Sequence, residues 1–151
     1  MAVAERAWCV VIPHHPRGAR IARQRLTTEL RGAVHPTLLA DAVAVLAELV
    51  GNAVRHASPL PGGVVRVAWR LRPAGSVVGV ERDSVEVRVT DGGAMTEQPR
   101  IRAIATDAID GRGLSIVAAL ADRWGVDRDG LGQSVWAELS SSFVHERRES
   151  P

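Results

Sequence analysis

The 151-residue sequence contains no lysine and no tyrosine, and it contains only one cysteine and one phenylalanine. All 19 basic residues are therefore arginine. A P-loop needs a lysine on the β- and γ-phosphates of its nucleotide, and a eukaryotic-type protein kinase needs a lysine on a strand. The absence of lysine excludes both of these designs for handling a nucleotide.

Aromatic side chains, paired cysteines and clusters of charge are also scarce. Aromatic residues make up 3% of the chain, so a platform for stacking nucleic-acid bases is not expected. The net charge is +2 and the arginines are spread along the sequence, whereas a nucleic-acid-binding surface needs them clustered. Cys9 alone can form neither an internal disulfide nor a multi-cysteine metal site. We expect no direct contact with nucleic acid.

Signals for export or membrane insertion are missing as well. Glu5 and Arg6 precede an apolar run too short for a signal peptide, and we find no stretch long enough to span a bilayer. The length and the hydrophobic fraction of 46% fit a single domain over residues 1–151, with a core at 8–139 and a loose tail at 140–151. We expect a cytoplasmic protein without a membrane partner.

The spacing of apolar residues predicts the element order β-α-α-β-β-loop-α-β-β. Strands are expected at residues 7–12, 64–69, 85–89, 124–126 and 134–139, and helices at 16–31, 36–57 and 112–123. Residues 92–111 show no period, and a loop of this length in a compact domain is usually functional. Paired strands with few helices predict an α/β fold, a two-layer sandwich with a mixed, mostly antiparallel sheet and helices on one face.

Three polar residues follow one line on the long helix predicted at 36–57. Glu48, Asn52 and His56 are four residues apart, so their side chains leave the helix on the same side. This line runs beside the predicted buried stripe of Leu39, Val43, Leu46, Val50 and Ala53. The oxygens of Glu48 and Asn52 suit Mg²⁺, and the carboxylate could equally orient or deprotonate a nucleophile. Taken alone, both residues also match ordinary solvated helix positions.

Three glycine-containing motifs follow along the chain. Asp91 ends a predicted strand before Gly92 and Gly93, so it can accept a hydrogen bond from an amine while the glycines let a flat ring approach. Residues 111–114, which are glycine, arginine, glycine and leucine, open a helix whose free N–H groups attract phosphate. Ser134 begins the last strand, where its hydroxyl could bond a ligand. Each motif alone also matches an ordinary turn, helix start or hairpin.

In this order the motifs resemble those of the GHKL, or histidine kinase-like, ATPase superfamily over residues 8–139. Glu48 to Ala53 resembles its N box, Asp91-Gly92-Gly93 its first glycine box, Gly111-Arg112-Gly113-Leu114 its second, and Gly132 to Val135 its last. Within the superfamily the chain is most similar to anti-sigma-factor serine/threonine kinases of actinobacterial type. The resemblance implies a Bergerat-type ATP-binding fold.

The resemblance also implies a role for each matched residue. Asn52 would hold the Mg²⁺ that bridges the phosphates of ATP, and Glu48 would act as general base or orient the attacking group. Asp91 would bond the adenine amine with Gly93 under the base, and Ser134 would lie near the adenine. Residues 94–110 would form a lid. The phosphates would be held by the second glycine box, at Gly111, Arg112, Gly113 and Leu114.

These roles imply a transcription regulator that phosphorylates an anti-anti-sigma protein and also binds a sigma factor. A homodimer is implied by the same similarity. Met95 stands where the first glycine box usually carries another glycine, which bears on the hinge of the lid. This departure keeps an alternative open: a non-catalytic nucleotide-binding module that sequesters a protein partner.

Overall fold

The computed structural model describes residues 4–76, 78–79, 81–93, 112–130 and 132–141. Its helices and strands follow the predicted order. They are β1 (Arg6–Pro13), α1 (Pro16–Leu30), α2 (Pro36–His56), β2 (Val64–Arg72), β3 (Ser84–Asp91), α4 (Arg112–Leu120), β4 (Arg123–Arg128) and β5 (Gln133–Ser140).

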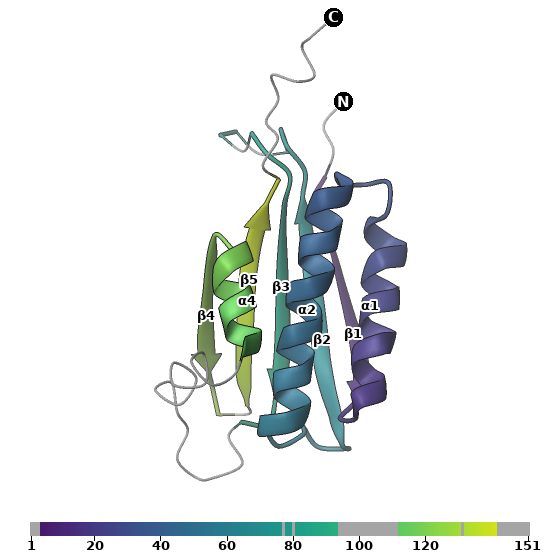
Figure 1. Ribbon diagram of the computed structural model, residues 1–151, viewed down its shortest axis with the longest axis vertical. Helices are drawn as coiled ribbons and strands as arrows, with labels where there is room; N and C mark the ends of the chain where they lie inside the picture. Colours follow the sequence, from purple (N-terminus) through teal and green to yellow (C-terminus); the bar gives the residue numbers. More distant parts are fainter. Residues whose placement is uncertain (1–3, 77, 80, 94–111, 131, 142–151) are drawn as a thin grey trace, which may run out of the picture.

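Five strands form one sheet in the order β1-β2-β3-β5-β4. Figure 1 shows that α1, α2 and α4 all lie over one face of this sheet. The predicted two-layer α/β sandwich with helices on one face is therefore confirmed. Each of the four pairings between these strands is antiparallel, so the mostly antiparallel sheet that we expected contains no parallel pair among them.

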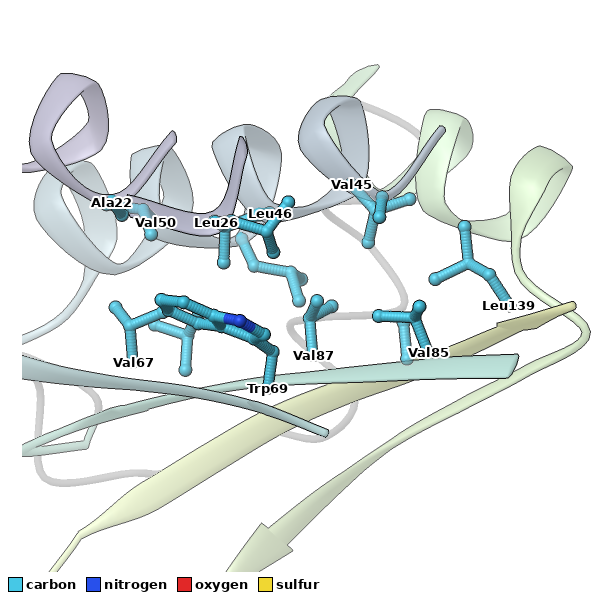
Figure 2. Close-up of a cluster of buried hydrophobic side chains, with 14 of the residues drawn as sticks. Ala22, Leu26, Val45, Leu46, Val50, Val67, Trp69, Val85, Val87 and Leu139 are labelled. Atoms are coloured by element: carbon cyan, nitrogen blue, oxygen red, sulfur yellow. The ribbon is translucent and has the colours of Figure 1, made fainter. Parts of the chain in front are cut away.

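The core lies between the helices and the sheet. Every second residue of β2 and β3 is buried, as the alternation of apolar and polar residues predicts. Trp69 is the largest fully buried side chain, and its ring stacks on that of Trp8 with the centroids 6.1 Å apart. Figure 2 shows the strand side chains Val67, Trp69, Val85, Val87 and Leu139 facing Ala22, Leu26, Val45, Leu46 and Val50 of the helices.

Helix α2 runs through the middle of the helical layer and contacts α1, α4 and the sheet. Its buried residues are Leu38, Ala42, Val45, Leu46, Leu49, Val50 and Ala53. The predicted stripe is correct for Leu46, Val50 and Ala53. Leu39 and Val43 are only partly buried at its edge, because the helix packs against neighbours on more than one side and its apolar face is wider than a single stripe.

By length and composition alone, α2 could cross a membrane, which differs from our sequence-based expectation. In the structure, seven of its apolar residues are buried in the core between the helices and the sheet. The helix is therefore the central packing element of this domain.

Two connections differ from the sequence prediction or refine it. Helix α4 ends at Leu120 and not at residue 123, because the N–H of Asp122 already donates to the carbonyl oxygen of Glu138, at 2.8 Å, and β4 begins at Arg123. The segment with Pro73 joins two strands that pair directly with each other. Strands β2 and β3 thus form a hairpin with a long connection.

Candidate functional site

The motifs singled out in the sequence meet at one end of the molecule. Figure 1 shows that α2 and β3 end there and that α4 and β5 begin there. The strand register pairs Asp91, the last residue of β3, with Gln133, the first residue of β5. Helix α2 contacts β3, β5 and α4. The antiparallel sheet and the helix layer thus bring distant parts of the sequence to one edge.

Asp91 lies on the side of β3 that faces the helices, in line with the buried Val85, Val87 and Val89. It is 3% exposed. Its Oδ1 accepts a hydrogen bond from the N–H of Gly93 at 2.7 Å, and its Oδ2 accepts none from any residue that the structure describes. Burial raises the pKa of Asp91 to about 6, although the Gly93 hydrogen bond and the charge of His14 act in the opposite direction.

Three backbone segments come into direct contact around Asp91. The N–H of Gly92 donates to the carbonyl oxygen of Ser58 at 2.7 Å, and the N–H of Ser58 donates to that of Gly93 at 2.9 Å. A Cβ on Gly92 would collide with the carbonyl oxygen of Pro59, and a Cβ on Gly132 would collide with that of Asp91. Glycine at these two positions therefore lets β3 dock against the segment after α2 and against the entry to β5.

The three polar residues in line on α2 become more exposed toward the end of the helix. Glu48 and Asn52 are half-buried, and His56 is exposed. The Oδ1 of Asn52 accepts a hydrogen bond from Nη2 of Arg55 at 3.0 Å. We did not predict Arg55 as a site residue. This guanidinium places a positive charge beside the oxygen that we predicted to bind Mg²⁺.

Ser134 is the predicted site residue whose placement differs most from the expectation. Its hydroxyl and that of Thr90 are 2.7 Å apart, and both residues lie on the sheet face that points away from the helices. Gln133 is the β5 residue on the same face as Asp91, and it is 9% exposed. The prediction therefore missed Gln133. Counting back in twos from the buried Leu139 and Ala137 would have found it.

His14 is a second residue that the sequence analysis did not place in the site. It follows β1 and is half-buried. Its Nε2 lies 2.8 Å from the carbonyl oxygen of Ala57 and 3.1 Å from that of Ala53, at the end of α2. No feature of the sequence around His14 pointed to these contacts.

The second glycine box is described only in part. Helix α4 begins at Arg112, and its first turn contains Leu114, which is 4% exposed and belongs to the hydrophobic core. Leu114 thus anchors the helix start in the core. The predicted lid at 94–110, which contains Met95, lies outside the described residues, as do Gly111 and the side chain of Arg112. Gly113 is in the first turn of α4.

The chain was compared with known proteins. A family model described as a histidine kinase-like ATPase domain matches residues 12–139. Among solved structures, the chain is similar to the RsbU and RsbW domains of Rv1364c from Mycobacterium tuberculosis, with a TM-score of 0.60 and 21% identity. The match covers 89% of this chain and 32% of that one, so this chain spans about a third of its length. No curated protein sequence matches the chain.

Proposed function

The chain belongs to the histidine kinase-like ATPase family, and from this premise we propose that it binds ATP with Mg²⁺ and phosphorylates a serine or threonine of a protein partner. We propose an anti-anti-sigma protein as the acceptor and a sigma factor as the second partner. The motif resemblance and the likeness to a protein with an RsbW domain support this choice. The observation that carries the proposal is that the buried Asp91, the polar edge of α2 and the start of α4 meet at one end of the molecule.

The carboxylate of Asp91 fits the adenine end of ATP. The N–H of Gly93 donates a hydrogen bond to Oδ1, and Oδ2 accepts none from the described residues. The exocyclic amine of adenine supplies such a donor. At a residue that is only 3% exposed, this hydrogen bond forms away from water and is correspondingly stronger. We infer that Asp91 selects the base, with Gly93 below it and Gln133 beside it.

The polar edge of α2 fits the metal and the phosphates. Mg²⁺ is usually bound through one or two protein oxygens together with substrate phosphates, and Asn52 offers such an oxygen at a half-buried position, one helical turn from Glu48. Bound Mg²⁺ would offset the negative charge of the phosphates. Asn52 would hold it through Oδ1, which accepts a hydrogen bond from Arg55 in this structure, and N–H groups at the start of α4 would receive a phosphate.

In the proposed reaction the hydroxyl oxygen of the acceptor attacks the γ-phosphorus of ATP, and the bond from that phosphorus to the β–γ bridging oxygen breaks. ADP leaves with the electron pair of the broken bond. The hydroxyl proton passes to the carboxylate of Glu48, which also orients the hydroxyl. Positioning and charge stabilisation supply most of the acceleration in phosphoryl transfer, so these few groups suffice for the chemistry.

One sequence feature favours a second function. Met95 replaces a glycine of the first glycine box, next to the proposed lid. If this change prevented closure of the lid, the protein would bind the nucleotide and sequester its partner without transferring phosphate. The two functions differ in whether the acceptor becomes labelled.

The test is transfer of ³²P from [γ-³²P]ATP to a purified anti-anti-sigma protein, with wild type, Glu48→Ala and Glu81→Ala. Glu81→Ala is the matched control, because Glu81 is exposed in the connection between β2 and β3. We expect a labelled acceptor with wild type and with the control. Glu48→Ala should bind ATP as before and lower the rate by about 100-fold or more, as loss of a general base does. Undiminished labelling with Glu48→Ala would remove Glu48 from the mechanism, and ATP binding without any labelling would support the sequestering module.

A further inference from the structure

His14 links the residue after β1 to the end of α2, next to the proposed site. Its backbone N–H donates to the carbonyl oxygen of Gly63 at 3.0 Å, which fixes the residue after β1. Its Nε2 lies within 3.1 Å of two oxygens, those of Ala53 and Ala57. Both are carbonyl oxygens and can only accept, so Nε2 must carry the hydrogen and donate.

The two acceptors lie where α2 ends. The carbonyl oxygen of Ala53 also accepts the N–H of Ala57, the residue after α2, at 3.2 Å. Carbonyl groups at the end of a helix carry partial negative charge, so a donor that contacts both oxygens holds the final turn and the residue after it together. Ala53 directly follows Asn52, and Ala57 directly precedes Ser58. Ser58 in turn exchanges hydrogen bonds with Gly92 and Gly93. His14 is thus joined, through the end of α2, to residues 91–93, which we call the Asp91 loop.

His14 also acts on Asp91 through its charge, which lowers the pKa of that carboxyl group against the larger effect of burial. The same side chain therefore holds the backbone that supports Asp91 and favours the form of Asp91 that accepts hydrogen bonds. The neighbouring His15 has a different role. His15 accepts a hydrogen bond from the N–H of Arg17 and caps the start of α1 instead.

We propose that His14 is a positioning residue for base recognition: by donating from Nε2 to the end of α2, it holds the Asp91 loop where Asp91 can accept the amine of adenine. This inference rests on the proposed ATP site and deepens it. His14 does not touch the base or the phosphates in this proposal. Its loss should therefore weaken the choice between bases and leave the contribution of the phosphates in place.

The test compares the affinities of ATP and of inosine triphosphate, in which a carbonyl group replaces the amine of the base. Titration calorimetry with Mg²⁺ gives the ratio of the two dissociation constants for each protein. Wild type should prefer ATP by about tenfold or more, since a hydrogen bond to a charged acceptor is at stake. His14→Ala and His14→Leu should lower this ratio at least about fivefold. His14→Gln, whose amide can donate to the same carbonyl oxygens, should restore most of it.

His15→Ala is the matched control and should keep the wild-type ratio, although it removes a helix cap. A folded His14→Ala or His14→Leu variant with the wild-type ratio would overturn the proposal. A wild-type protein that binds ATP and inosine triphosphate equally would instead refute the proposed role of Asp91. If neither variant folds, the histidine side-chain ¹H–¹⁵N spectrum of wild type decides: a neutral His14 with its hydrogen on Nδ1 would overturn the proposal.

Discussion

At Asp91, the group that we propose for binding the base also lowers the stability of the free protein. Its carboxyl group is 3% exposed, and burial raises its pKa to about 6. At pH 7 the group is mostly ionised, but it has little of the water that would solvate its charge. The free protein is therefore destabilised at the point where we propose that the amine of the base binds. Such local destabilisation is expected where the rest of the fold holds a binding group in an unfavourable environment.

The raised pKa predicts a specific pH dependence of stability. Between the ordinary value of 3.8 and about 6, the folded protein binds more protons at Asp91 than the unfolded chain, so stability falls as the pH rises through this window. From pH 5 to pH 7.5 the contribution is about 1.4 kcal/mol. The free energy of unfolding, measured in urea, should fall by about this much more for wild type than for Asp91→Asn. Parallel pH profiles for the two proteins would contradict the raised pKa.

Gly132 allows a second residue-scale prediction. A Cβ there would collide with the carbonyl oxygen of Asp91, and this oxygen belongs to the backbone of a paired strand and cannot simply rotate away. Gly132→Ala should cost about 1–3 kcal/mol of stability and weaken ATP binding by moving Asp91. Gly130→Ala is the control, because a Cβ on Gly130 meets no atom within 4 Å. If both variants matched wild type in urea unfolding and in calorimetry, the close approach of the two segments would be refuted.

At the scale of elements, α2 links the core to the site. One side of the helix is buried against the sheet and its neighbouring helices, and Glu48 and Asn52 lie half-buried beside that face. The helix is long, and its core contacts run along most of it, so the packing fixes the rotation of the helix about its axis. That rotation decides where the oxygens of Glu48 and Asn52 lie. Core packing and site geometry are therefore coupled through this element.

Leu46 tests which face of α2 is buried, because its side chain lies fully buried between the helix and the sheet (Figure 2). Leu46→Ala should lower the free energy of unfolding by about 2–5 kcal/mol, through lost burial and the cavity left behind. Leu39→Ala, at a partly buried position at the edge of the core, should cost clearly less. Urea unfolding of both variants measures the difference. Equal costs would mean that the buried face of α2 is not where the structure places it.

The elements were largely predictable from the sequence, because alternation in strands and helical spacing are local patterns. Strands β2 and β3 and the hairpin of β4 and β5 follow these patterns closely. The end of α4 was missed, since a contact with β5 and not a local signal ends it at Leu120. The rotation of α2 was only partly predicted, because several neighbours share its apolar face.

At the scale of the whole molecule, the site depends on contacts between distant parts of the chain. The motif resemblance pointed to Asp91 and Asn52, whereas the contacts of His14 with Ala53 and Ala57 span 39 and 43 residues and leave no mark in a local pattern. The hydrogen bond from Arg55 to Asn52 is local, but it depends on a rotamer that the sequence does not specify. The sequence thus indicated the kind of ligand better than it indicated the residues that hold the site in shape.

Titration of ATP, with and without Mg²⁺, into wild type, Asn52→Ala and Asp91→Asn tests the central claim most directly. The account predicts that wild type binds ATP more tightly when Mg²⁺ is present. Asn52→Ala should lose most of that gain, and Asp91→Asn should bind at least about tenfold more weakly in both conditions, because each variant removes one end of a single site. If both variants bound ATP with the affinity of wild type, these residues would not form a shared nucleotide site, and the account would be wrong.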